Sequence, residues 1–472
     1  MKGPGRVRQA IGTEAPRGNE GPPESNLEVA ILGAGMAGYG AAHRLQGEGV
    51  RPVVFEQRPS HGGHTASYTT KAGFTFDEGP HISFTNDSEV QEIFAEAVGH
   101  EYEALEVEFN NYWKGRWIKH PVQTNLNGLP RDLVIEVLKD YFAAYHSPAD
   151  PASMETFADW LRASYGRTFA ENFPMVYGKK YHTADAEEMT TDWLGPRLYQ
   201  PDPDEVLFGT LVRDTPDVHY VRECRYPTEG GFASYLSRFP DLAELRTGRR
   251  VVAVDPARGL VRFADGSAVA AERIVSSLPL PELVPMIEGV PDDVAEASRR
   301  LACTTCVVVN LGVAREDLSD VHVNYFYDPD ISFARVSYPH MLSPRNTPPG
   351  HGSIQAEVYF SEKYKPLRQE ASELVPVVIR DLQRCGVLRD GDELVEAHAL
   401  RIPYANVIFD RDRPSAVATV HGFLDDVGID YCGRYGEWDH IWTDQAFRSG
   451  QRAAERVLEK AVPAGRAGGS VG

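Results

Sequence analysis

The alternation of apolar and polar residues is clearest near the start of the chain, where it predicts a strand, a helix and a second strand in close succession. Four apolar residues at 29–32 predict a short buried strand. A second apolar run at 52–55 predicts the next strand. Between them, small and apolar side chains recur at helical spacing, at Ala37, Ala41, Ala42 and Leu45. This order is that of a parallel βαβ unit.

Glycines and one acid occupy the turns of this unit. Gly33, Gly35 and Gly38 join the first strand to the helix, and Glu56 follows the second strand. A tight turn requires Gly33, a pyrophosphate can lie against the backbone only where Gly35 has no side chain, and close helix packing favours Gly38. Glu56 stands where an acid binds ribose hydroxyls. The sequence therefore predicts a dinucleotide site. These residues alone do not distinguish an FAD site from an NAD site.

Later parts of the chain alternate between helical and strand patterns. Helical periodicity marks residues 88–105 and 130–175, and a strand pair is predicted around residues 114–115. Three short strands with glycine turns begin at Arg250, and residues 301–400 alternate in the manner of an antiparallel sheet with one helix. A chain of 472 residues should divide into two or three structural units.

Composition narrows the classes of function. No apolar run approaches the ~20 residues of a membrane span. Residues 1–26 are rich in Gly, Pro, Glu and Arg without an apolar stretch, so we expect a disordered extension rather than a signal peptide. The net charge of −20, with only isolated arginine pairs, argues against nucleic acid as a partner. A small-molecule substrate is the partner that we expect.

Cysteine usage indicates a reducing compartment. Five cysteines without a regular framework predict a cytoplasmic protein. Cys303 and Cys306 form a CxxC, but the chain has no second CxxC and the flanking apolar run predicts a buried strand. We therefore expect a structural role for both cysteines and no metal site.

The residues after Glu56 resemble a known family. A second glycine turn, Gly62-Gly63, follows the acid, and His81 lies within the later segment 79–87. This opening resembles the FAD-binding segment of the superfamily of amine oxidases, protoporphyrinogen oxidases and phytoene desaturases. Segment 79–87 resembles the corresponding part of UDP-galactopyranose mutases. The resemblance implies FAD as cofactor, with Gly62 and Gly63 beside its ribityl diphosphate and His81 near the flavin ring.

The last strand and helix are similar to the C-terminal FAD motif of the same superfamily. A predicted strand runs into Gly433, and a helix begins near residue 443. A helix start offers free N–H groups and the positive end of a dipole to electron-rich oxygens. The resemblance implies that Gly433, Arg434 and Gln445 bind the flavin and that Val251 lies against the adenine.

Together these features predict an α/β fold, in which a discontinuous Rossmann-type FAD-binding domain carries an inserted helical region and an antiparallel-sheet substrate domain. The predicted boundaries are a disordered extension at 1–26, the FAD-binding domain at 27–87, 245–285 and 425–462, the substrate-binding and helical regions at 88–244 and 286–424, and a flexible tail at 463–472.

The substrate residues follow from the resemblance to the mutases. Arg197 and Arg335 match arginines that bind a nucleotide diphosphate there, and a guanidinium suits that role because it is permanently charged and can bind bidentately. Tyr181 stands where a mutase tryptophan packs beside the sugar. His81 and Arg335 are also catalytic candidates, although a purely structural role for His81 stays open.

The segment that begins at Tyr404 departs from the mutase pattern. Tyr404 is retained as a catalytic candidate, whereas Asn406 replaces a second tyrosine and becomes a substrate-binding candidate. If that tyrosine helps to position a diphosphate, its replacement weakens the resemblance to a mutase and leaves the FAD prediction untouched.

Three functions therefore stay open. The first is an FAD-dependent oxidoreductase that transfers a hydride to the flavin from a polar substrate, either a sugar, which can be nucleotide-linked, or an amine. We expect this substrate to be anionic or to contain a sugar. The second is a non-redox sugar-nucleotide mutase that uses reduced flavin as a nucleophile. The third is a binding protein with a vestigial flavin site. We favour the first because of Asn406 and because the superfamily is mostly redox-active.

Overall fold

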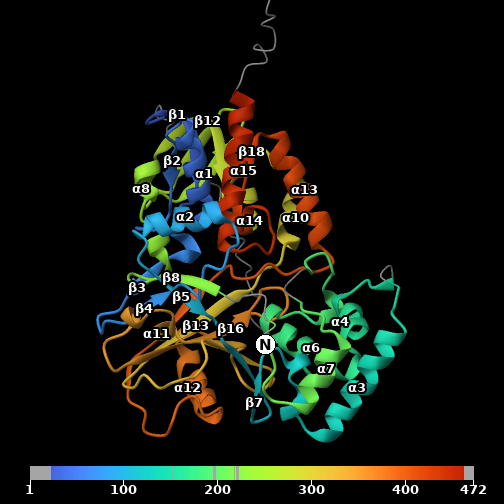
Figure 1. The fold of residues 1–472 in the computed structure, drawn as a ribbon. Helices are drawn as coiled ribbons and strands as arrows, with labels where there is room; N and C mark the ends of the chain where they lie inside the picture. Colours follow the sequence, from blue (N-terminus) through green and yellow to red (C-terminus); the bar gives the residue numbers. More distant parts are fainter. Residues whose placement is uncertain (1–22, 151–152, 195–197, 217, 219–222, 462–472) are drawn as a thin grey trace, which may run out of the picture.

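Three parts of the molecule meet around a common centre (Figure 1). The computed structural model describes residues 23–150, 153–194, 198–216, 218 and 223–461. One sheet with its helices lies at the top of the view, a second sheet lies below it on the left, and a group of helices lies below it on the right. The predicted α/β class, with parallel and antiparallel sheets, is confirmed.

The first sheet takes its strands from three separate stretches of chain. Its order is β10-β11-β12-β1-β2-β9, with β18 beside β12. Pairing is parallel from β18 through β12, β1 and β2 to β9, and a β10-β11 hairpin adds an antiparallel edge. The strands are β1 (Asn26–Leu32), β2 (Val53–Phe55), β9 (Glu244–Arg246), β10 (Val251–Asp255), β11 (Leu260–Phe263), β12 (Ala268–Ser276) and β18 (Ile429–Tyr431).

The start of the first sheet corrects one predicted boundary. The disordered extension was expected to reach residue 26, but Asn26 begins β1 and the backbone N–H of Glu24 donates to the Ala268 carbonyl at 2.9 Å. Sheet pairing therefore includes the end of the predicted extension. Residues 1–22 and the predicted tail at 463–472 lie outside the described residues.

Helix α1 (Met36–Gly47) and the C-terminal helix α15 (Thr443–Ala461) pack so closely that backbone meets backbone. A Cβ atom on Gly40 would lie 1.9 Å from the carbonyl oxygen of Phe447. A Cβ atom on Gly450 would lie 1.9 Å from a carbonyl oxygen of α1. Because interiors are close-packed, no side chain fits at either position.

The second sheet has the order β17-β13-β16-β15-β14-β6-β7. All its pairs are antiparallel except β14 with β6. Helix α12 (Leu374–Arg384) packs on one face of the sheet. The strands are β6 (Phe109–Trp113), β7 (Arg116–Lys119), β13 (Thr305–Val313), β14 (Val323–Phe326), β15 (Arg335–Ser337), β16 (Gly352–Phe360) and β17 (Leu394–Ile402). The predicted strand pair around residues 114–115 is β6 and β7.

The third part is helical, as the periodicity of residues 130–175 predicts. Thr156 and Asp159 form a reciprocal capping box that starts one of these helices. The helices of this part are α3 (Arg131–His146), α4 (Phe157–Tyr165), α5 (Arg167–Asn172), α6 (Pro174–His182) and α7 (Pro203–Leu211).

Other predicted elements and boundaries differ from the structure. The helix expected over 88–105 ends early, because α2 covers Ser88–Ala97 and β5 (Tyr102–Glu106) then pairs with β8 (Glu223–Pro227). Helices α10 (Asp292–Arg300) and α13 (Arg413–Asp426) share one hydrophobic core with the first sheet and with the helices of the third part. Because this core takes in both regions, the predicted boundary between them stays a prediction.

The cysteines support the structural role expected of them. All five are free thiols, and Cys306 is buried in β13. Cys303 pairs with Val407 in an isolated bridge just before this strand. None of the described helices combines the length and apolar character that a membrane span requires.

The close contact between α1 and α15 predicts that adding one methyl group at Gly450 will destabilise the fold. Gly450→Ala should lower the free energy of unfolding by about 1–3 kcal/mol, because overpacking forces the two backbones apart. Gly422→Ala is the matched control, since Gly422 also lies within a helix and has nothing within 4 Å of its Cβ position. It should be neutral or stabilising by up to about 1 kcal/mol. Equal midpoints in denaturant for both variants would contradict the prediction.

Candidate active site

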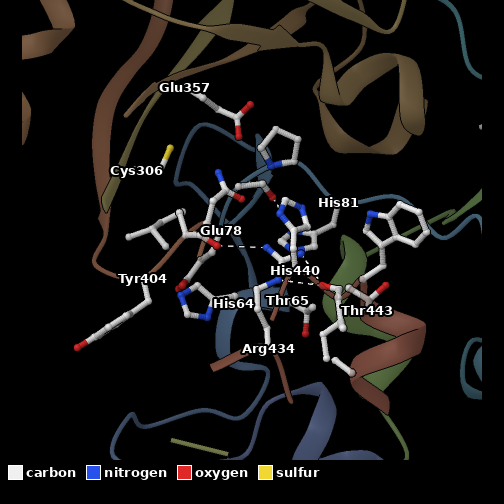
Figure 2. Close-up of a pocket in the computed structure, with 18 of the residues that line it drawn as sticks. His64, Thr65, Glu78, His81, Cys306, Glu357, Tyr404, Arg434, His440 and Thr443 are labelled. Atoms are coloured by element: carbon white, nitrogen blue, oxygen red, sulfur yellow. Dashed lines mark hydrogen bonds between the residues drawn. The ribbon is translucent and has the colours of Figure 1, made fainter. Parts of the chain in front are cut away.

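A cavity of about 650 Å³ lies where the three parts of the molecule meet. The carboxyl ends of β1 and β2, one face of the second sheet and helix α6 form its walls. In open parallel sheets, ligands bind at this end of the strands. Figure 2 shows His64, His81 and Arg434 close together at the centre, with Glu357 and Cys306 on the side of the second sheet.

The glycine turn after β1 faces the cavity with backbone alone. Gly33 has a φ of +101°, and its Cβ would lie 2.3 Å from the hydroxyl oxygen of Ser277. A Cβ on Gly38 would lie 2.3 Å from the Gly33 carbonyl oxygen. Gly35 differs, because its φ is −89° and the nearest protein atom to a Cβ there is 3.8 Å away. The protein itself therefore tolerates a side chain at Gly35, whereas a ligand lying on this turn would not.

Glu56 lies at the end of β2, beside the same turn. One carboxylate oxygen accepts from the Ala34 backbone N–H at 3.0 Å, and the other accepts from the Arg58 backbone N–H at 2.9 Å. The side chain is thus held at the cavity wall with lone pairs left for a ribose. Val251 lines the same end of the cavity.

The second glycine turn closes over the first. Gly62 and Gly63 have φ values of +119° and +56°, which glycine adopts without strain. Gly62 pairs with Gly35 in an isolated bridge, so two stretches of backbone without side chains face each other at the cavity wall. This arrangement gives an anionic diphosphate access to backbone N–H groups.

The C-terminal motif reaches the cavity through Gly433 and Arg434. Gly433 has a φ of +78°, and its N–H donates to the Ser449 hydroxyl at 2.7 Å. The Arg434 guanidinium donates to the carbonyl of Ile441 at 2.6 and 2.9 Å and to that of Ala405 at 3.2 Å. These acceptors are neutral carbonyls, so the positive charge of Arg434 is held at the cavity without a carboxylate bond.

Gln445 lies elsewhere. It is exposed, its side-chain oxygen accepts from the Trp442 N–H at 2.9 Å, and it is absent from the cavity lining. Its side-chain oxygen is used at the start of α15, so its contact with the flavin stays a prediction.

Two partly buried histidines of the cavity wall flank Arg434. The Nδ1 of His81 lies 2.7 Å from the Gly79 carbonyl oxygen. A carbonyl only accepts, so this nitrogen carries the proton and Nε2 keeps a free lone pair. Burial lowers the pKa of His81 to about 4, and the neighbouring Arg434 and Arg335 add to the shift. His81 is therefore neutral at pH 7.

His64 was not among the sequence candidates, yet it lines the cavity next to the second glycine turn. Burial lowers the pKa of His64 to about 3, helped by the positive charge of Arg58. Its Nε2 is buried and has no hydrogen-bond partner in the part of the chain that the structure describes. An unpaired buried ring nitrogen beside a ligand cavity suits a polar group of a ligand. Only its place just after Gly63 could have indicated this.

Arg335 lines the cavity as predicted, but it is already paired. It lies on β15 directly opposite Glu357 of β16, and the two side chains form a two-point ion pair with one contact at 2.8 Å. Burial alone would lower the pKa of Arg335, but the Glu357 carboxylate raises it well above its ordinary value. Tyr359 donates to the same carboxylate at 2.9 Å. Sequence reasoning missed Glu357.

Tyr181 and Asn406 meet across the cavity wall. The Tyr181 hydroxyl donates to the Asn406 side-chain oxygen at 3.2 Å, which links α6 to the loop before α13. The amide nitrogen of Asn406 is buried and has no partner among the described residues. Both residues line the cavity, so a substrate atom that accepts a hydrogen bond could complete the site.

Tyr404 and Arg197 do not reach this group in the described structure. The Tyr404 ring lines the cavity, but its hydroxyl points away from His81 and Arg434 (Figure 2). The expectation of a catalytic Tyr404 is therefore unsupported by its orientation. Arg197 lies outside the described residues.

Comparison with known proteins shows the family. A model of the flavin-containing amine oxidoreductases matches residues 36–458. The chain belongs to this family. Its match to curated relatives is much shorter: it is 39% identical over 74 residues to the 15-cis-phytoene desaturase of Narcissus pseudonarcissus, which is 16% of this chain and 13% of that protein. The lycopene-forming phytoene desaturase of Pantoea ananas is 42% identical over 65 residues, again 13% of its length.

Solved structures of other proteins superpose on most of this flavin-containing amine oxidoreductase. Reduced UDP-galactopyranose mutase superposes with a TM-score of 0.86 at 23% identity, covering 93% of this chain and 96% of the mutase. Putrescine oxidase bound to putrescine superposes with a TM-score of 0.62 at 16% identity, covering 92% and 100%. At such identities the likeness shows the fold.

The residues of the cavity fit FAD. An adenine dinucleotide requires open backbone for its diphosphate and an acid for its ribose. The cavity offers both, through the open position at Gly35 with the paired glycine turns and through the Glu56 carboxylate. The unpaired His64 nitrogen offers one further polar contact. As a member of the flavin-containing amine oxidoreductases, the protein is an FAD-dependent enzyme. In the described part of the chain, no group of three or more His, Cys, Asp or Glu side chains is placed to hold a metal.

Gly35 provides a test of the cofactor site. Gly35→Val should keep its fold, because the backbone there is unstrained and a Cβ has space, but it should lose FAD because the side chain fills the groove. Gly35→Ala should retain more FAD than the valine variant. The ratio of flavin to protein absorbance and FAD titration of the apoprotein measure binding, and circular dichroism checks folding. Full flavin content in Gly35→Val would show that the groove is misassigned.

His182 gives a prediction for pH. It is buried against Trp193 in the cavity wall, and burial lowers its pKa to about 4. The unfolded chain, with a pKa near ~6.5, takes up a proton first as pH falls, so the folded state loses stability between about pH 6.5 and 4. His182→Phe should remove about 2 kcal/mol of the stability loss between pH 7 and 5. Urea unfolding at both pH values measures it. The exposed His146 is the control, and His146→Phe should leave the loss unchanged.

Proposed function

We propose that this flavoenzyme is an oxidoreductase that removes a hydride from a carbon bearing a hydroxyl or amino group in a small polar substrate. The observation that carries the proposal is His81. Its ring is neutral, its proton is held on Nδ1 by the Gly79 carbonyl, and its Nε2 lone pair is available in the cavity wall. Removal of a hydride from such a carbon also releases the proton of its oxygen or nitrogen, and a neutral imidazole accepts that proton.

FAD supplies the hydride acceptor when bound. The residues of this chain bind and orient it through Gly35, Glu56 and the second glycine turn. Arg434 holds a positive charge at the centre of the cavity, where it stabilises negative charge that develops on a bound group. Tyrosine rings that line the cavity beside the second sheet limit the access of water.

The substrate side of the cavity supports a polar small molecule. Tyr181 and Asn406 stand in the wall, and the unpaired Asn406 amide offers a donor to a substrate oxygen. Arg197 stays a predicted anion-binding residue. The free thiols fit the cytoplasm as the compartment in which the enzyme works.

A sugar-nucleotide mutase is the second candidate. The observation in its favour is the TM-score of 0.86 with UDP-galactopyranose mutase, against 0.62 with putrescine oxidase. In that case the reduced cofactor would act as a nucleophile, and no net electrons would be consumed. The presence of Asn406 where the mutases have a tyrosine favours the redox reaction over the mutase reaction.

The two functions give opposite results under anaerobic conditions. Holoenzyme with oxidised flavin is mixed with UDP-galactose, galactose and putrescine, and the flavin absorbance is followed. An oxidoreductase should lose its yellow colour with its substrate and regain it with an electron acceptor. The same panel is given to dithionite-reduced enzyme. Many turnovers of isomerisation by reduced enzyme, without bleaching of the oxidised form, would refute the redox proposal and support the mutase.

The role of His81 predicts both a rate and a pH profile. His81→Gln should lower kcat/KM by about 10²–10⁴-fold with FAD retained, because an amide cannot take the proton. In the wild type, kcat/KM should fall only as pH drops through about 4, where His81 becomes protonated. His351 is the matched control because it does not line the cavity, and His351→Gln should behave as the wild type. A wild-type rate in His81→Gln would remove His81 from the mechanism.

A further inference from the structure

The side chains of Arg335 and Glu357 form a charged floor on the face of the second sheet that meets the cavity. They occupy directly opposed positions on β15 and β16, and both line the cavity. Glu357 is 3% exposed, and 24% of the Arg335 side chain is exposed. Figure 2 shows the Glu357 carboxylate directed into the space that His81 also faces. The pair has no net charge, although each member keeps its own.

The two members differ in hydrogen-bonding capacity. A guanidinium only donates, and a carboxylate only accepts. A fully ionised phosphate or diphosphate only accepts, so at this floor it would bind Arg335 but would be repelled by the Glu357 oxygens. An ammonium only donates, so at this floor it would bind the Glu357 carboxylate but would be repelled by the Arg335 guanidinium. A hydroxyl both donates and accepts, and adjacent hydroxyls can engage both members at once.

The walls around this floor are made of tyrosine. Four tyrosine rings follow one another along the wall. The distance between ring centroids is 5.4 Å for Tyr325 and Tyr177, 5.7 Å for Tyr177 and Tyr181, and 4.8 Å for Tyr181 and Tyr359. All four rings line the cavity. Such a wall offers apolar ring faces to the carbon skeleton of a ligand and hydroxyls to its polar edge. The buried Asn406 amide nitrogen, which lacks a partner among the described residues, adds one further donor beside Tyr181.

We propose that Arg335 and Glu357 act together as a hydroxyl-recognition site, which selects the polyhydroxylated, uncharged part of a substrate and disfavours a phosphate or an ammonium at this position. The substrate class is therefore a sugar or related polyol, whose carbon to be oxidised lies near His81. This inference rests on the proposed function and specifies its substrate. It also revises the role expected of Arg335, because the Glu357 carboxylate already balances the charge of this guanidinium, which therefore attracts a diphosphate less than an unpaired arginine would.

Binding measurements on the FAD-loaded enzyme test this without turnover. The probes are methyl β-galactoside, inorganic pyrophosphate and putrescine, each titrated while flavin absorbance and heat are recorded. The wild type should bind the galactoside more tightly than either ion. Glu357→Gln frees Arg335 and should raise the affinity for pyrophosphate by at least about tenfold while weakening the galactoside. Glu282→Gln is the matched control, because it removes another cavity carboxylate, and pyrophosphate affinity there should change by less than about threefold.

A double variant provides a second test if Glu357→Gln does not fold with FAD bound. Arg335→Gln with Glu357→Gln removes both charges and should lose the galactoside without gaining pyrophosphate. Tighter binding of pyrophosphate than of galactoside by the wild type, or the same probe preference in every folded variant, would overturn the proposal. Either result leaves the anaerobic bleaching test unaffected, so failure of the recognition site and failure of the redox function are distinguishable.

Discussion

The close contact between α1 and α15 is the constraint on which the rest of the molecule depends. Gly40 and Gly450 let the two helices meet backbone to backbone, and a Cβ on Gly433 would lie 2.8 Å from Ala37 of α1. The helix that follows the first glycine turn is thereby locked to the last strand and helix of the chain. Because Arg434 comes directly after Gly433, its distance from the dinucleotide groove is set by this contact. A loosened helix pair would move Arg434 as well as weaken the fold.

The charged side chains that line the cavity are mostly paired with opposite charges, and two of its histidines are neutral. Arg58 is paired with Glu78 at 2.6 Å and Arg335 with Glu357, whereas burial keeps His64 and His81 uncharged. Burying a lone charge is costly, so such pairing lets ionic groups line an enclosed site. Arg434 is solvated by backbone carbonyls instead. The chain of net charge −20 thus keeps a positive group at the centre of the cavity, next to His64 and His81.

The sequence predicted the features that depend on neighbouring residues and missed those that depend on pairing between distant ones. Gly33, Gly35 and Glu56 belong to one continuous βαβ unit, so their roles could be inferred from spacing. Glu357 could not, because its partnership with Arg335 depends on strand register, which packing decides. Tyr404 and Gln445 were placed near the right loops, but the direction of a side chain depends on the hydrogen bonds that it finds. Those bonds are invisible in a linear pattern.

The origin of the first sheet in three distant stretches has a consequence for synthesis of the protein. Strand β1 leaves the ribosome early, whereas β18 and α15 emerge near the end, beyond residue 428. At about 5–20 residues per second, some 400 residues require about 20–80 s. Over that interval the cofactor fold lacks a strand and its tightest helix contact, and the buried face of α1 stays uncovered. Premature termination shortly before residue 443 would therefore leave a nearly full-length chain that cannot close its FAD site.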